Sequence, residues 1–223
     1  MAINNKLDVI VSLTSWKKRI DNVPRTIFSL YNNTFKPRSI ELNLSEEEFP
    51  NKEKDLPKDL LLMATELPIN INWVGKNTKS FKKIIPTIKK YFDEKELYLF
   101  SADDDVIYPK DILEKFIAIN LKHQGTCCVC FGNCAGSLSK QPVVRGAATL
   151  YKIGFFTDFV WKGLTPEIIA TNEDDWWYSY CFLKTGTRSI SFTKLRLKFF
   201  NEQGKHQYNT GKTKRMYTKM IGR

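Results

Sequence analysis

The 223-residue sequence lacks a long apolar run, since no stretch approaches the roughly 18 residues that a membrane-spanning helix needs. Its N-terminus does not show the pattern of a signal peptide, and neither repeats nor low-complexity segments are visible. We therefore expect a folded cytoplasmic protein. The hydrophobic content of 42% is sufficient for one well-filled core.

Two kinds of site are also missing. No Gly-x-Gly-x-x-Gly follows the first predicted strand, which argues against a dinucleotide-dependent oxidoreductase. Four of the five cysteines fall close together, but without the two Cys-x-x-Cys pairs of a zinc site. These four are Cys127, Cys128, Cys130 and Cys134. We interpret the cysteines as reduced, with those of the predicted strand 126–131 acting as small apolar residues.

Acidic residues are fewer than basic ones. Thirty-five Lys and Arg against twenty-four Asp and Glu give a formal net charge of +11. Such a charge favours polyanions, anionic membrane surfaces or phosphorylated ligands, and it does not choose among them. From residue 201 onward the chain is polar and basic, so we expect a basic C-terminal tail at 201–223.

Three carboxylates stand together directly after a predicted strand. The apolar run Leu97–Ala102 ends in Asp103, Asp104 and Asp105. Like charges this close repel, and a bound cation would relieve the repulsion. Oxygen ligands favour a hard ion such as Mg²⁺ or Mn²⁺, so we predict a metal site here. The alternative is a solvated acidic turn that caps the helix beginning at Asp111.

Strands and helices are predicted to alternate through the first half of the chain, which is typical of a mostly parallel sheet with helices on both faces. The predicted strands are 7–13, 39–44, 69–74, 97–102, 126–131, 143–151 and 189–195. The predicted helices are one after Pro24, then 58–65, 84–91, 111–121, and a last one from Thr171 or Asn172 to about Leu183, ended by Gly186. We predict a single α/β domain over residues 1–200.

A second acidic cluster, Glu173, Asp174 and Asp175, is predicted near the start of the last helix. The positive end of a helix dipole favours ionised carboxylates. One of them could act as a general base that takes a proton from a hydroxyl group. The alternative is an acidic first turn with no catalytic role.

Basic residues follow two predicted strands, and they could converge with the aspartates on a phosphorylated ligand, because carboxyl ends of parallel strands meet at one edge. These residues are Lys17, Lys18 and Arg19 after the first strand, and Lys76, Lys79, Lys82 and Lys83 after the third. The small residues from Gly146 to Ala148 would let a ligand approach the backbone, or mark a bulge. His206 is either a metal ligand or an ordinary surface residue.

Together these motifs resemble bacterial glycosyltransferases of the GT-A fold, in particular the family 2-like enzymes that build surface polysaccharides. The resemblance covers about residues 7–183. It rests on the segments 9–15 with Arg19, 81–86, 103–105 and 173–174. It implies a single Rossmann-like domain that binds a nucleotide-sugar.

The resemblance also implies roles for individual residues. Asp103 and Asp105 would form the Asp-x-Asp motif that holds Mn²⁺ or Mg²⁺ on the donor diphosphate, with His206 as a further metal ligand. Asp174 would be the general base, with Glu173 and Asp175 beside it. The residues expected to line the nucleotide-sugar are Thr14, Ser15, Arg19, Lys82, Lys83, Asp103, Asp104 and Gly146.

The implied reaction moves a sugar from a nucleoside-diphosphate sugar, expected to be UDP-linked, to a hydroxyl of a glycan or lipid-linked acceptor, with inversion. No nucleic acid partner is expected. The basic charge leaves open peripheral association with the inner face of the membrane, and the short chain leaves open a homo-oligomer that completes the acceptor site. The alternatives are a metal-dependent nuclease or phosphodiesterase that uses both acidic clusters, and a non-catalytic polyanion-binding module.

Overall fold

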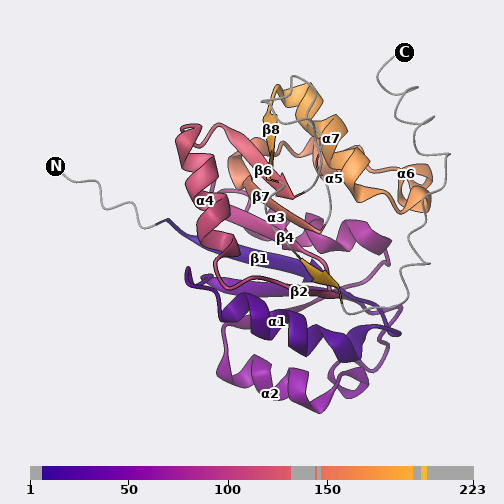
Figure 1. Ribbon diagram of the computed structural model, residues 1–223. Coiled ribbons are helices and arrows are strands. Elements are labelled where there is room, and N and C mark those ends of the chain that lie inside the picture. Colours follow the sequence, from indigo (N-terminus) through magenta and orange to yellow (C-terminus); the bar gives the residue numbers. More distant parts are fainter. Residues whose placement is uncertain (1–6, 132–143, 145–146, 193–196, 200–223) are drawn as a thin grey trace.

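The computed structural model describes residues 7–131, 144, 147–192 and 197–199 (Figure 1). A seven-stranded sheet forms its centre, with the strand order β3-β2-β1-β4-β7-β6-β8. Its strands are β1 (Val9–Thr14), β2 (Ser39–Ser45), β3 (Ile69–Val74), β4 (Tyr98–Ala102), β6 (Cys127–Phe131), β7 (Ala148–Lys152) and β8 (Arg188–Phe192). A separate antiparallel pair joins β5 (Val106–Ile107) to β9 (Lys198–Phe199).

The sheet is mostly parallel, as the alternation of strands and helices predicts. Strands β3, β2, β1 and β4 run parallel to one another, and β8 runs parallel to β6. Strand β7 is the exception, because it lies antiparallel between β4 and β6. In the register of β1 and β4, Ser12 lies beside Ser101, so both strands end at the same edge of the sheet.

Helices cover both faces of the sheet. Helices α1, α2 and α4 pack on one face, and α3, α5, α6 and α7 pack on the other. Figure 1 shows α1 and α2 together at the bottom of the view, α7 beside β8 at the top, and α6 at the right. The helices are α1 (Val23–Tyr31), α2 (Lys58–Glu66), α3 (Ile85–Lys90), α4 (Ile112–Lys122), α5 (Phe159–Lys162), α6 (Pro166–Thr171) and α7 (Asp174–Thr185). Short 3₁₀ turns are η1 (Ile20–Asn22), η2 (Lys52–Asp55), η3 (Lys79–Lys83) and η4 (Ile153–Phe155).

The side chains of β1 show why this sheet is covered twice. Val9, Val11 and Leu13 belong to the core beneath α1, α2 and α4, whereas Ile10 belongs to the core beneath α3 and α7. All four side chains are fully buried. Burying an aliphatic side chain contributes about 1.5–3 kcal/mol, so both layers of helices stabilise the same strand.

Two predicted helices begin later than the sequence pattern indicates. The helix predicted from Thr171 or Asn172 begins at neither residue, because Thr171 ends α6 and Asn172 adopts a left-handed conformation with φ of 57°. Helix α7 then begins at Asp174, with Glu173 in the capping position. The helix predicted over 84–91 begins at Ile85, preceded by the 3₁₀ turn η3. The predicted end at Gly186 is confirmed, since Gly186 is the left-handed C-cap of α7.

Several predicted features lie outside the described residues: Gly146, Cys134, His206, the tail 201–223 and part of the strand predicted over 189–195. Of the strand predicted over 143–151, the described strand is β7, which begins at Ala148 and extends to Lys152, while Val144 and Ala147 lie outside it. Among the described residues, no helix combines the length and the apolar character that a membrane crossing requires.

Candidate functional site

The three consecutive aspartates form the turn between β4 and β5, at the edge where the parallel strands end. Asp104 points inward and is only 1% exposed. The hydroxyl of Ser15 donates a hydrogen bond of 2.6 Å to its carboxylate, and the hydroxyl of Thr26 donates to its backbone carbonyl at 3.0 Å. The Asp103 amide donates to the hydroxyl oxygen of Tyr108 at 2.8 Å. The turn is thus fixed from β1, α1 and β5, and Asp104 is one of its structural supports.

Arg19, in the loop after β1, binds two of these aspartates. Its guanidinium nitrogens lie 2.8 Å from the Asp104 carboxylate and 2.9 Å from the Asp105 carboxylate. Burial raises the pKa of Asp104 to about 6, although the charge of Arg19 and the hydrogen bond from Ser15 act in the opposite direction. The buried Nε of Arg19 has no hydrogen-bond partner among the described residues.

Lys83, the last residue of η3, joins the two acidic clusters. Its Nζ lies 2.9 Å from Asp103 and 3.3 Å from Asp174, and its side chain is 9% exposed. Burial alone would lower the pKa of the ammonium, but the nearby carboxylates of Asp103, Asp174 and Asp175 raise it well above the ordinary value. Lys83 is therefore charged in the folded protein. The sequence predicts the two clusters separately, and this lysine brings them together.

Asp174 lies in the first turn of α7 and is buried. Burial raises the pKa of its carboxyl group, and the charge of Lys83 opposes that rise. Glu173 and Asp175 flank it and are both half-buried. The Glu173 amide donates to the hydroxyl of Thr171 at 3.2 Å, which helps to fix the approach to α7.

The segment before α7 is also tied to η3. The Ser80 amide donates to the side-chain oxygen of Asn172 at 3.1 Å, and the Ser80 hydroxyl donates to the Asn172 carbonyl at 3.2 Å. Lys79 donates from its ammonium to the Ala170 carbonyl at 3.3 Å. Asn172 suits its position because asparagine tolerates the left-handed conformation better than most residues.

The charges at this edge bear on whether a divalent metal would fit. Carboxylates of Asp103, Asp104, Asp105 and Asp174 contact the two cations Arg19 and Lys83, which leaves a formal charge of −2. The sequence analysis predicts that a metal ion balances these aspartates, and Arg19 and Lys83 already supply part of that positive charge. A divalent ion would balance the remainder.

The exposed carboxylates suit such an ion. Asp103 and Asp105 are 31% and 18% exposed, whereas Asp104 faces the interior. No group of three or more His, Cys, Asp or Glu in the described part of the chain could by itself hold a metal. Magnesium-type ions are commonly held by one or two carboxylates, with substrate phosphates and water completing the shell. Asp103 and Asp105 fit that kind of site.

Comparisons of the sequence alone show no relative: no protein-family model matches, and a search of curated proteins finds no significant match. Solved structures do match. S. aureus TarS in complex with UDP has a TM-score of 0.59 at 12% identity, and with UDP-GlcNAc a TM-score of 0.61 at 12% identity. The mannosyltransferase PcManGT from Pyrobaculum calidifontis, in complex with GDP-Man and Mn²⁺, has a TM-score of 0.60 at 13% identity.

The chain shares the α/β fold of TarS and PcManGT. The matches cover 86% of this chain for TarS with UDP, 96% for TarS with UDP-GlcNAc and 90% for PcManGT. This chain spans 59% of the length of the UDP-bound TarS chain and of PcManGT, and 66% of the UDP-GlcNAc-bound chain. The predicted Rossmann-like α/β fold class is therefore confirmed.

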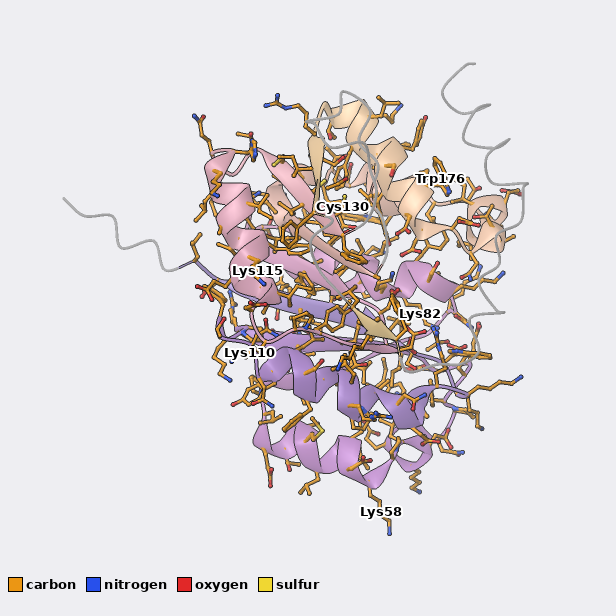
Figure 2. All side chains as sticks on the ribbon, in the orientation of Figure 1. Lys58, Lys82, Lys110, Lys115, Cys130 and Trp176 are labelled. Atoms are coloured by element: carbon orange, nitrogen blue, oxygen red, sulfur yellow. The ribbon has the colours of Figure 1, made fainter. Side chains whose placement is uncertain are left out.

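Two residues predicted to line the nucleotide-sugar, Lys82 and Thr14, contact groups other than the aspartates. Lys82 directs its ammonium to Glu48, in an ion pair, and to the side-chain oxygen of Asn77 at 2.9 Å. Thr14 donates its hydroxyl to the Asn43 carbonyl at 2.7 Å. Figure 2 shows Lys82 near the edge where the parallel strands end, with Trp176 on α7 above it. The adjacent residues Lys82 and Lys83 therefore serve different parts of this edge.

The structure adds residues that no short motif indicates. Tyr108 is buried, accepts from the Asp103 amide and donates to the Ala147 carbonyl, so it links the aspartate turn to the start of β7. Ser80 and Asn172 come together from positions 92 residues apart. Their only signal in the sequence is proximity to predicted site residues, because hydrogen bonds between distant segments leave no local pattern.

The raised pKa of Asp104 predicts a pH dependence of stability. The folded protein holds this proton more tightly than the unfolded chain, whose aspartate has the ordinary value of 3.8. The contribution of Asp104 to stability is therefore most favourable below about pH 4 and is lost as the pH rises through about 6. A shift of about two pKa units corresponds to roughly 3 kcal/mol. Asp104→Asn removes this titration.

We therefore expect the free energy of unfolding of Asp104→Asn, relative to the wild type, to rise by roughly 3 kcal/mol between about pH 4 and pH 7. Urea unfolding in the presence of a chelator measures both proteins across this range. A difference between them that stays constant with pH would contradict the assignment.

Proposed function

We propose that this protein is a metal-dependent glycosyltransferase that moves a sugar from a nucleoside-diphosphate sugar to a hydroxyl group. The observation that carries the proposal is the convergence of the two acidic clusters at the carboxyl edge of the sheet. Lys83 lies 2.9 Å from Asp103 and 3.3 Å from Asp174. In open α/β sheets, ligands bind at this edge. A metal ligand and a general base would therefore act on one substrate.

On the donor side, we propose that Asp103 and Asp105 hold Mn²⁺ or Mg²⁺. When bound, the ion supplies positive charge to the leaving diphosphate. Arg19 supports this side in two ways: it fixes Asp105 at 2.9 Å, and its buried Nε is a donor without a partner in the described part of the chain. The hydrogen bond from Ser15 to Asp104 also fixes the turn that carries Asp103 and Asp105.

On the acceptor side, we propose that Asp174 is the general base. Its carboxylate takes the proton of the acceptor hydroxyl, and the hydroxyl oxygen forms a bond to the anomeric carbon. The bond from that carbon to the diphosphate oxygen breaks, and the nucleoside diphosphate leaves with both electrons. This single displacement inverts the anomeric carbon. Glu173 and Asp175 flank the base and could hold the acceptor.

TarS is solved with UDP and UDP-GlcNAc, and PcManGT with GDP-Man and Mn²⁺. We propose a UDP-linked donor and a glycan or lipid-linked saccharide as acceptor. The net charge of +11 favours binding of the protein to an anionic membrane surface. We propose one catalytic domain to about residue 200, followed by the basic tail 201–223 with His206.

Thermal unfolding with a panel of nucleotides tests the proposal. We expect one nucleoside diphosphate and its nucleotide-sugar to raise the midpoint of unfolding with Mn²⁺ or Mg²⁺, and to have no effect with a chelator. A ligand at 100 times its dissociation constant stabilises the native state by about 2.7 kcal/mol. A stabilising oligonucleotide, with no effect of any nucleotide-sugar, would instead favour the nuclease alternative.

A further inference from the structure

Lys83 has a role that a phosphate-binding lysine would not have. We infer that Lys83 is a positioning residue that holds the general-base carboxylate of Asp174 at a fixed place relative to the donor-side carboxylate of Asp103. This inference rests on the proposed function and assigns the lysine to the base rather than to the diphosphate. The geometry of its backbone, its ammonium and its neighbour Lys82 supports it.

The backbone of Lys83 is fixed on the sheet. Its carbonyl accepts a hydrogen bond from the Ser12 hydroxyl at 2.5 Å and another from the Asn43 side chain at 3.2 Å. Ser12 and Asn43 are fully buried residues of β1 and β2. The side chain therefore extends from a rigid support and not from a mobile surface loop.

The ammonium of Lys83 contacts two carboxylates at once. An ammonium carries three hydrogens, and this one lies 2.9 Å from Asp103 and 3.3 Å from Asp174. The side chain is 9% exposed, in contrast to a lysine that reaches into solvent for a phosphate. Lys82 is as deeply buried but turns to Glu48, so the pairing of Lys83 with the two aspartates is selective.

Lys83 reduces the electrostatic repulsion between the two carboxylates that the proposed reaction uses. Asp103 and Asp174 are 71 positions apart in the sequence, and two anionic carboxylates brought close together repel each other. A charged lysine between them lets both stay ionised and close. When Asp174 takes the proton of the acceptor hydroxyl, Lys83 keeps its own proton and its pairing with Asp103. The lysine therefore orients the base and is not consumed.

Kinetics separate positioning from phosphate binding. The probes are UDP-GlcNAc and GDP-Man with MnCl₂, and the readout is release of UDP or GDP by the full chain. We expect Lys83→Met to lower kcat on the order of 10²-fold, because a small misplacement of a reacting group has about that effect. The KM for the donor should change less than about threefold, since uniform donor binding is kept. Lys83→Arg, which restores a cation, should recover part of kcat.

The matched control is Lys90→Met. Lys90, at the other end of α3, also pairs with a buried carboxylate, Glu41, at 2.8 Å. This variant should keep kcat and KM near the wild-type values. A Lys83→Met variant that keeps kcat, or one that raises the donor KM with kcat unchanged, would overturn the inference. The second result would mean that Lys83 binds the donor diphosphate.

A second measurement tests the bridge without turnover. Lys83→Met leaves the buried carboxylate of Asp174 and the half-buried carboxylate of Asp103 without their shared cation, so its Tm should fall by about 4 °C or more. Adding Asp174→Asn to Lys83→Met should raise the Tm, whereas the same change in the wild-type background should not. Equal effects of Asp174→Asn on the Tm in both backgrounds would overturn the inference. As a control, the effects of Lys90→Met and Asp174→Asn on the Tm should be additive.

The two arms keep the inference and the proposed function distinct. If the wild type releases neither UDP nor GDP and no nucleotide raises its Tm, the proposed function fails. The thermal cycle of Lys83 and Asp174 still decides whether the bridge exists. If the cycle shows coupling and Lys83→Met retains full kcat, the bridge is structural and the positioning role is wrong.

Discussion

Asp174→Asn is expected to lower kcat for sugar transfer by about 10²- to 10⁴-fold, the usual contribution of a general base. The amide has nearly the shape of the carboxylate but cannot accept the proton of the acceptor hydroxyl. Binding of the nucleoside diphosphate with Mn²⁺ should survive, because Asp103 and Asp105 are unchanged. Steady-state kinetics measure the first effect, and the metal-dependent rise in Tm measures the second.

Two further variants make this result specific. Asp175→Asn tests the next carboxylate in the same helical turn, and a larger loss of kcat there than in Asp174→Asn would make Asp175 the base. Asp158→Asn is the control, since Asp158 precedes α5 and pairs with the exposed Lys162. Full turnover by Asp174→Asn would remove Asp174 from the base role.

Asp105→Asn is expected to abolish the Mn²⁺-dependent rise in Tm that a nucleoside diphosphate produces. A bound metal ion supplies several kcal/mol of charge stabilisation, so kcat/KM should fall on the order of 10²-fold or more. The variant also loses one partner of Arg19, but Asp104 still holds the guanidinium at 2.8 Å. Calorimetric titration with Mn²⁺ and UDP measures the loss of binding directly.

Asp111→Asn is the control for this experiment. Asp111 is an aspartate near the same segment, placed before α4 and paired with Lys115 at 2.7 Å. It should leave the Mn²⁺-dependent shift unchanged. A shift that persists undiminished in Asp105→Asn would mean that nucleotide binding does not depend on this carboxylate.

Periodicity identifies the regular elements of this chain. The strand predicted over 69–74 is β3 without a change of bounds, and the strand predicted over 39–44 is one residue shorter than β2. Both segments alternate apolar and polar residues, a signal that depends on neighbours in the sequence. The division between α6 and α7 is missed because the left-handed conformation of Asn172 is stabilised by Ser80, far away in the sequence.

The direction of β7 is another feature that local sequence does not carry. The residue pattern of a strand that is buried on both faces does not depend on the direction of the strand. The antiparallel direction of β7 is therefore visible only in its pairing with β4 and β6. The predicted mostly parallel sheet is therefore confirmed, and β7 is its antiparallel member.

The sequence by itself determined the α/β class, most strand and helix positions, and two acidic clusters at the ends of elements, because each depends on the order of nearby residues. Only the tertiary structure decided which cations meet those acids. Arg19 reaches Asp104 and Asp105, Lys83 reaches Asp103 and Asp174, and Lys82 turns away to Glu48. Adjacent lysines look alike in sequence, and the packing of η3 against β1 and β2 directs one of them into the site and the other away from it.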